Sequence, residues 1–120
     1  MTFMFENLEV YQKALEFADE ITVVTESFPG KYRFLVDQLN RAALSIATNS
    51  AEGNGRFTKP DRRNFFIIAR ASAQECVPLL EIARRRGLVP DSTVLGFRER
   101  LETIARMISG LIKGLNKRSV

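Results

Sequence analysis

The sequence predicts an all-α protein, an antiparallel up-down-up-down four-helix bundle. Apolar residues recur every three or four positions in four long segments, and no segment alternates with a period of two. Glycine and proline clusters at residues 28–30, 53–60 and 87–90 separate these segments. Because the turns are short, the helices should pack alternately up and down in a single domain over residues 1–120. We expect helices at residues 7–28, 32–53, 59–86 and 92–117.

The first segment predicts an amphipathic helix. Its core face should hold Tyr11, Leu15, Ala18 and Thr22, which lie three or four residues apart, with Ala14, Ile21 and Phe28 widening the stripe. This part of the chain is acidic, because residues 1–30 carry a net charge of −5 within a total of +4. Acidic and basic helices side by side most often form solvated faces and intramolecular ion pairs.

The second and third segments are apolar on more sides than one bundle can bury. In the second, Leu39 and Ile46 define one face, and Leu44 lies on the back. The third presents Ile68 and Ile82 beside its core stripe. A four-helix monomer would expose this surface, which favours an oligomer. The alternative is that neighbouring helices and loops cover it.

Capping signals set the starts of the third and fourth helices. Thr58 followed by Asp61 predicts the N-terminus of the third helix, and Asp91 or Ser92 can cap the fourth. Pro78 lies in the middle of the third segment, where proline removes a backbone hydrogen bond. Because the apolar pattern continues in register, we interpret Pro78 as a kink and not a break.

Polar side chains border the apolar face of the second segment, and Glu75 lies inside the apolar arc of the third. A lone buried carboxylate is costly unless it is paired, so Arg41 is its expected partner. A carboxylate catalyst is the less favoured interpretation, because no nucleophile with an adjacent base accompanies these residues. We interpret them as a structural network or subunit contact that comprises Gln38, Arg41, Ser45, Asn49, Glu52 and Glu75.

The composition argues against an enzyme. The chain has no histidine, no tryptophan and one cysteine, which excludes histidine acid/base catalysis, Cys-His pairs and an internal disulfide. We expect Cys76 to be a small buried hydrophobe, and the seven aromatic residues of the first three segments, such as Phe17 and Phe66, to belong to the core. We expect no cofactor, metal or membrane span. The first residues lack the features of a signal peptide, so the expected location is the cytoplasm.

Residues 38–56, QLNRAALSIATNSAEGNGR, resemble the signature of bacterial four-helix bundle proteins encoded by intervening sequences within 23S rRNA genes. Phe28-Pro29 at the first turn and the Phe66 region fit the same pattern, although Ala71 stands where the family usually has glycine. The resemblance implies a left-handed bundle that assembles as a homopentameric ring without enzymatic activity. Similar proteins act as accessory subunits that bind nucleic acid and a reverse transcriptase in diversity-generating retroelements.

Basic residues should gather at one end of such a bundle, because the second turn and the C-terminus share a pole. Residues 31–120 carry a net charge of +9, which suits phosphate backbones without sequence specificity. Glu6, Glu9, Glu52 and Asp61 should temper the charge at that pole. A solvated pole explains the charges equally well, and a scaffold that recruits a protein partner is the alternative function. The bases at 84–86 end a helix at the opposite pole, where the helix dipole accounts for them. The candidate nucleic-acid-binding residues are Arg56, Lys59, Arg62, Arg63, Lys113, Lys117 and Arg118.

Overall fold

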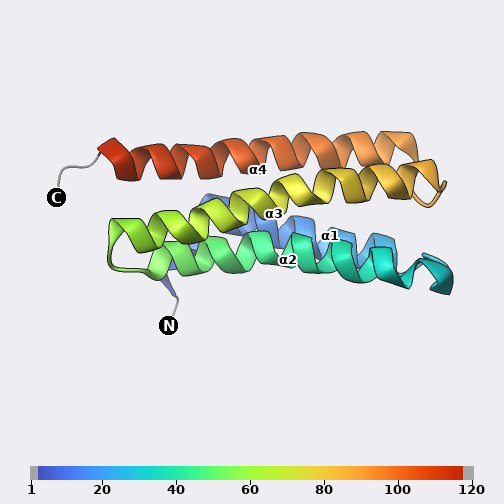
Figure 1. Ribbon diagram of the computed structural model, residues 1–120, viewed down its shortest axis with the longest axis horizontal. Coiled ribbons are helices and arrows are strands. Elements are labelled where there is room, and N and C mark those ends of the chain that lie inside the picture. The colour runs from blue at the N-terminus through green and yellow to red at the C-terminus, as the bar shows by residue number, and fades with distance from the viewer. Residues whose placement is uncertain (1–2, 118–120) are drawn as a thin grey trace.

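Four long helices make up most of the computed structural model, which describes residues 3–117 and the side chains of residues 3–115 (Figure 1). No β-strand occurs in this range. Two short 3₁₀ turns, η1 and η2, precede the first and second helices. The elements are η1 (Met4–Asn7), α1 (Glu9–Thr25), η2 (Gly30–Tyr32), α2 (Arg33–Gly55), α3 (Lys59–Arg85) and α4 (Asp91–Lys117).

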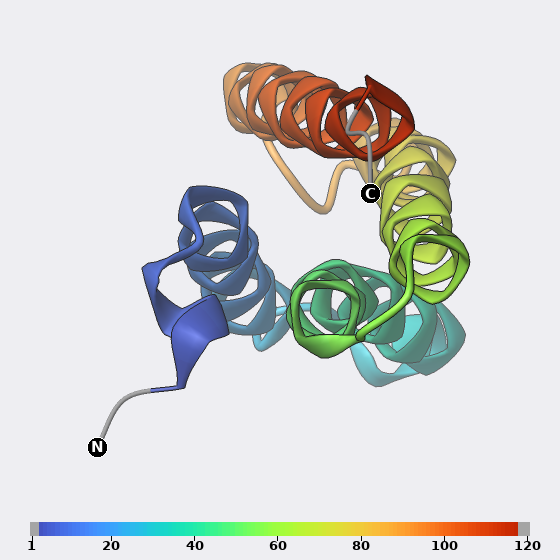
Figure 2. The ribbon, with the colours of Figure 1, turned by 90° about the vertical axis from the view of Figure 1, so that its left-hand side faces the viewer.

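The helices lie side by side in an elongated bundle of 51 × 29 × 20 Å. The chain reverses direction from each helix to the next (Figure 1), and the end-on view shows the helices in chain order around one axis (Figure 2). Each helix packs against its neighbours in sequence, while α1 approaches α4 much less closely. The α2–α3 turn, η1 and the last turn of α4 lie at one end, which we call the α2–α3 pole.

The core runs the length of the bundle. Phe17 of α1 and Phe97 of α4 meet edge to face, with ring centroids 5.6 Å apart. The largest side chains with almost no exposed surface come from all four helices: Val10, Phe17, Ile21, Leu35, Leu39, Ile46, Cys76, Leu80, Ile104 and Ile108.

The expected core face of the first helix is confirmed at Ala14, Ala18 and Ile21 and wrong at Leu15 and Thr22. Leu15 is 44% exposed and Thr22 is exposed, whereas Ala14, Phe17 and Ile21 are fully buried. Two stripes with helical spacing run side by side along α1. The stripe that carries the large Phe17 ring takes the core, because it buries more apolar area.

The first helix is also shorter than residues 7–28. Leu8 is extended, with ψ of 118°, so α1 begins only at Glu9. At the other end α1 stops at Thr25, and the Phe28 N–H donates to the Thr25 carbonyl in a turn. Pro29 disfavours a helical conformation in the residue before it, which accounts for the early end.

The third helix starts as expected and is continuous through Pro78. The Thr58 hydroxyl accepts a hydrogen bond from the Asp61 N–H at 3.3 Å. Pro78 lies on the exposed side of α3, where water can satisfy the carbonyl that loses its partner. The fourth helix differs from expectation, because Asp91 is its first residue and the Pro90 carbonyl accepts from Thr93 and Val94.

Small residues bring α2 and α3 close together. At position 53 of α2 only glycine fits, because a Cβ added there would lie 2.7 Å from the Phe66 ring of α3. Farther along the same seam, the hydroxyls of Ser45 and Ser72 are 2.8 Å apart. Asn49 also donates to the Ser45 hydroxyl at 2.9 Å. The α2–α3 pair is therefore held by close packing and a short polar bridge.

Cys76 lies in the middle of α3 and is fully buried, as the sequence predicts. Burial, assisted by the neighbouring Glu75 carboxylate, raises the pKa of the Cys76 thiol to about 12. The thiolate is the reactive form of cysteine, so this side chain behaves as a small apolar group.

Replacing Gly53 with alanine should destabilise the bundle. Alanine favours a helix by about 1 kcal/mol over glycine, but overpacking against Phe66 costs about 1–3 kcal/mol. We expect Gly53→Ala to lower the urea midpoint of unfolding. Gly110→Ala is the matched control, because nothing lies within 4 Å of its added Cβ and the change should stabilise α4. A midpoint for Gly53→Ala at or above that of the wild type would contradict this packing account.

Candidate functional site

The α2–α3 pole brings together the described members of the predicted basic group. Arg56 follows α2, while Lys59, Arg62 and Arg63 lie in the first turns of α3. Lys113 is exposed near the end of α4 at the same pole. The Lys117 backbone ends α4, but its side chain and the whole of Arg118 lie outside the described residues.

Two of these arginines, Arg62 and Arg56, also make contacts within the chain. Arg62 donates from Nε to the Gly53 carbonyl at 3.2 Å and from Nη2 to the Asn54 carbonyl at 3.3 Å. The last carbonyls of a helix lack partners within it, so these bonds satisfy the end of α2. They also account for the extension of α2 to Gly55, two residues beyond the expected end. Sequence reasoning missed this role, because it depends on how α3 approaches α2.

Arg56 is held by a carboxylate and a ring. Its Nη2 lies 2.9 Å from Oε2 of Glu52, and its guanidinium lies 4.6 Å from the centroid of the Phe65 ring. The Arg56 side chain remains 46% exposed, so the pair is a surface ion pair. Such pairs contribute little to stability, about 0–1 kcal/mol. The contacts orient the guanidinium while leaving it accessible.

Two phenylalanines at this pole lie outside the four predicted helices and outside the core. Within the first three segments, the prediction that aromatic residues belong to the core is confirmed at Phe17 and Phe66 and wrong at Phe34, which is 62% exposed. Phe57 is fully exposed and Phe3 is 65% exposed. Both line a groove of about 890 Å³ between η1 and the α2–α3 turn, which Arg56 and Arg62 also line. Phe57 lies between the last residue of α2 and the cap Thr58, outside every helical stripe. From the sequence, that position could have indicated that the Phe57 side chain does not pack in the core.

The predicted polar network divides into two parts. Ser45 and Asn49 form the bridge to Ser72 described above. Gln38 and Glu52 lie on the exposed face of α2, where Glu52 pairs with Arg56.

The expected pair of Arg41 and Glu75 is wrong within a single chain. Both side chains are exposed, and the structure shows no ion pair between them. Glu75 lies in an apolar arc, as predicted, but solvent covers that arc, so the carboxylate needs no buried partner. A subunit contact through these residues stays a prediction.

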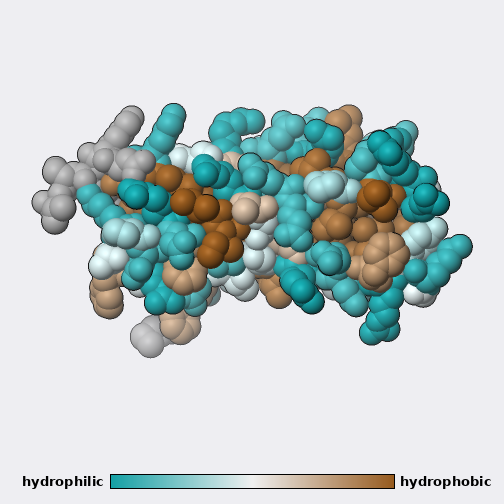
Figure 3. Space-filling view, viewed as in Figure 1, coloured by the Kyte–Doolittle hydropathy of each residue, from teal (hydrophilic) through white to brown (hydrophobic). Residues whose placement is uncertain are grey.

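The outer side of α3 carries this exposed apolar arc, which we call the α3 outer face. Ile67, Ile68 and Ile82 are 41%, 39% and 43% exposed, and Ala71 and Pro78 are exposed between them. Apolar surface appears as separate patches among hydrophilic residues in the space-filling view (Figure 3). The expectation that α3 keeps apolar surface outside the core is confirmed.

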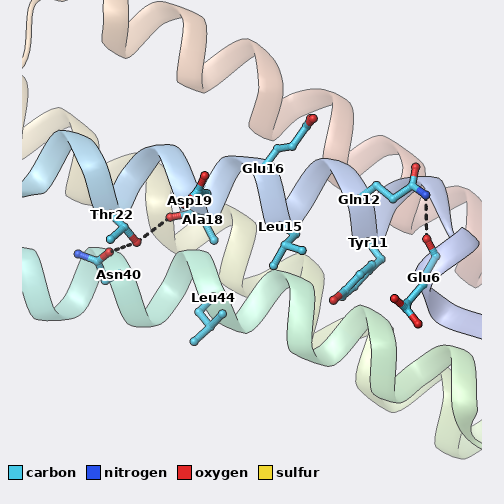
Figure 4. Close-up of a pocket in the computed structure, with 10 residues that line it drawn as sticks. All are labelled: Glu6, Tyr11, Gln12, Leu15, Glu16, Ala18, Asp19, Thr22, Asn40 and Leu44. Atoms are coloured by element: carbon cyan, nitrogen blue, oxygen red, sulfur yellow. Dashed lines mark hydrogen bonds between the residues drawn. The ribbon is translucent and has the colours of Figure 1, made fainter. Parts of the chain in front are cut away.

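The back of α2 is only partly covered. Ala47 is buried, but Leu44 remains 51% exposed and faces Leu15 of α1 across a groove of about 860 Å³ (Figure 4). At one end of this groove Asn40 accepts from the Thr22 hydroxyl at 3.1 Å. Asn40 also donates to the Thr25 hydroxyl at 3.0 Å. The sequence analysis did not predict this link between α1 and α2. The presence of two threonines, Thr22 and Thr25, in an otherwise apolar stripe was the feature that could have indicated it.

Two comparisons relate the chain to known proteins. The model of the 23S rRNA-intervening sequence protein family matches residues 6–110. The chain belongs to this family. A search of the curated proteins found no match. A crystal structure at 1.70 Å of a protein with unknown function, from the S23 ribosomal protein family of Bacteroides thetaiotaomicron, is similar with a TM-score of 0.80. The identity is 24%, over 87% of this chain and 98% of that chain, so the likeness shows the fold.

The family match covers all of α1, α2 and α3 and most of α4, and therefore the turn that forms the pole. Among the described residues of this family member, no helix is both long and apolar enough to cross a membrane. The same residues contain no group of three or more cysteine, aspartate or glutamate side chains placed to hold a metal ion.

The arginines at the opposite pole of this 23S rRNA-intervening sequence protein are paired. Glu81 accepts from Arg84 at 2.8 Å and from Arg85 at 3.0 Å, and Arg84 also lies 3.5 Å from Asp91. Hydrogen bonds from Arg84 and Arg85 lower the pKa of Glu81 to about 2. This cluster links the end of α3 to the start of α4, so ion pairing adds to the effect of the helix dipole.

The Glu81 cluster should give the protein a measurable acid sensitivity. Because the folded-state pKa is lowered, Glu81 stabilises the fold above its ordinary pKa of 4.5. That contribution is lost as the pH falls from about 4.5 toward about 2. We expect Glu81→Gln to lower the thermal midpoint at neutral pH and to match the wild type more closely at low pH. Glu102→Gln, an exposed change on α4, is the control. A difference for Glu81→Gln that stays constant with pH would contradict the ionic role.

Proposed function

We propose that this protein is a non-enzymatic, oligomeric helical bundle that binds the phosphate backbone of nucleic acid as an accessory factor in the cytoplasm. The observation that carries the proposal is the concentration of basic side chains at the α2–α3 pole. Residues 52–63 contain four basic and two acidic side chains, and the exposed Lys113 adds another base from α4. Glu6 of η1 and Glu9 at the start of α1 lie at the same pole, so five described basic side chains stand beside four acidic ones. Phosphate contacts of this kind position a protein on nucleic acid without reading its sequence.

The fixed arginines support this proposal. A guanidinium carries five N–H donors, and Arg62 uses two of them on the carbonyls of α2. Arg56 is oriented by Glu52 and Phe65 and is still about half exposed. Side chains that are already ordered lose less conformational entropy when they bind a phosphate oxygen. The pole therefore offers preorganised donors where described basic side chains outnumber acidic ones by one.

Assembly is the second part of the proposal. The α3 outer face exposes apolar side chains at helical spacing, which favours contact with another subunit. We expect a left-handed bundle in a homopentameric ring, in which Glu75 and Arg41 come from different subunits. Such a ring would repeat the α2–α3 pole on one face and multiply its charge.

The alternative function is a scaffold that recruits a protein partner without binding nucleic acid. The α1–α2 groove favours it, because Leu15 and Leu44 face each other across the groove (Figure 4), and Glu6, Glu16 and Asp19 also line it. A basic amphipathic helix would suit such a groove. Capture of a protein in high salt would support this alternative, whereas salt-sensitive retention of RNA and DNA would support the first.

Removing charge at the α2–α3 pole should weaken binding. We expect the double variant Arg56→Gln, Lys113→Gln to lower the affinity for a labelled RNA hairpin and a labelled DNA duplex alike. The slope of log affinity against log salt should fall by roughly 0.7–0.9 for each phosphate that the variant no longer neutralises. Fluorescence anisotropy in a salt series measures both quantities.

The matched control for charge removes two bases near the other end of the bundle, through Arg33→Gln and Arg98→Gln, both exposed. Arg62 is kept in both variants because its bonds close α2. Equal losses in the two double variants would mean that net charge, and not the pole, governs binding. No binding of the wild type to either nucleic acid at tens of micromolar would favour the scaffold.

The assembly should depend on the α3 outer face. We expect light scattering to give about five times the chain mass of 13.6 kDa. The variant Ile68→Asp, Ile82→Asp should dissociate the oligomer, because charged groups do not desolvate without partners. Val23→Asp, a change at an α1 position that is 60% exposed, is the control and should leave the mass unchanged. A wild-type mass near 13.6 kDa at micromolar concentration would overturn this part of the proposal.

A further inference from the structure

We infer that the groove at the α2–α3 pole is a stacking site for an unpaired base, so that the protein prefers single-stranded nucleic acid to duplex. This inference rests on the proposed binding of phosphate at the same pole, and it names the form of nucleic acid that binds there.

Phe57 is the central observation. Its side chain is fully exposed in the turn between α2 and α3, where burial in the core would be the ordinary outcome for phenylalanine. Phe3 lies on the same groove, is 65% exposed, and stacks on Phe5 with ring centroids 5.6 Å apart and an interplanar angle of 18°. The pole thus presents planar apolar surface that no other part of the described chain covers.

The size and chemistry of the groove fit a base. Its volume of about 890 Å³ exceeds that of one nucleotide, and it is concave, so a planar ring can enter between η1 and the turn. Thr48 lines the same groove with an exposed hydroxyl that can hydrogen-bond a base edge.

Charge selects nucleic acid over a neutral aromatic ligand. Arg56 and Arg62 line the groove together with Glu52, so its cations outnumber its one carboxylate, and Lys59 lies two residues beyond Phe57. An aromatic platform beside cations that follow a backbone is the arrangement used by proteins that bind single strands. Duplex bases are stacked on one another and cannot lie on Phe57 without unpairing, whereas phosphates are available in both forms. Stacking on Phe57 therefore adds to the affinity for single strands and not to the affinity for duplexes.

The test compares a labelled RNA strand of about a dozen nucleotides with the blunt duplex of the same sequence, by anisotropy with the full chain. We expect Phe57→Ala to weaken binding of the single strand about tenfold and to leave duplex binding and the salt slope unchanged. Phe57→Tyr should keep the wild-type affinity. Phe34→Ala is the matched control, because Phe34 is 62% exposed at the start of α2, at the opposite pole.

A second readout locates the base. A 2-aminopurine in the strand should change in fluorescence on binding the wild type, and this change should be absent in Phe57→Ala. Wild-type affinity of Phe57→Ala for the single strand, or equal losses for strand and duplex, would overturn the inference while leaving phosphate binding intact. Failure of the wild type to bind either RNA would instead overturn the proposed function and this inference together.

Exposed phenylalanines beside basic residues also suit an anionic membrane surface, so vesicles of phosphatidylserine and phosphatidylcholine form the third arm. We expect no cosedimentation with them. Cosedimentation that Phe57→Ala abolishes would overturn the inference in favour of a lipid surface.

Discussion

Close packing of α2 on α3 is the constraint on which the rest of the structure depends. At Gly53 the two helices leave no space for a methyl group beside Phe66, and at Ser45 and Ser72 they are near enough for hydroxyls to bond directly. Helices at such separation interdigitate along a long seam, and dispersion contacts accumulate over it. The other helices then add to this pair, α1 against α2 and α4 against α3, with α1 and α4 in weaker contact.

The geometry of the pole follows from that packing. Because α2 and α3 converge at Gly53, only a few residues are needed to connect them, and Arg62 of α3 reaches the last carbonyls of α2. The same tight turn leaves Phe57 with no neighbour to pack against, and so the ring points into solvent. One arginine is thereby ordered and one phenylalanine exposed by a single structural cause. The combination that supports nucleic-acid binding is a consequence of how the two central helices meet.

Local signals made most of the helical architecture predictable. Proline and glycine clusters, helical periodicity and the Thr58 cap act over a few residues, and they located four helices within a few positions of their observed ends. Where two outcomes compete, the sequence alone does not decide between them. On α1 the expected stripe is wider than the face that the core takes, and the position of Phe17 against Phe97 leaves Leu15 and Thr22 outside it. The role of Arg62 and the exposure of Glu75 depend on which surfaces the neighbouring helices reach, and periodicity carries no such information.

The single thiol has a practical consequence for how this bundle can be observed. Cys76 lies in the centre of α3, shielded by its neighbours, and its pKa of about 12 leaves almost no thiolate at neutral pH. A thiol reagent can therefore react only when α3 separates from the helices around it. The rate of that reaction reports how often the core opens, in the same way as slow amide hydrogen exchange. Modification of Cys76 would therefore measure transient opening of the core around α3, without any residue being added to the protein.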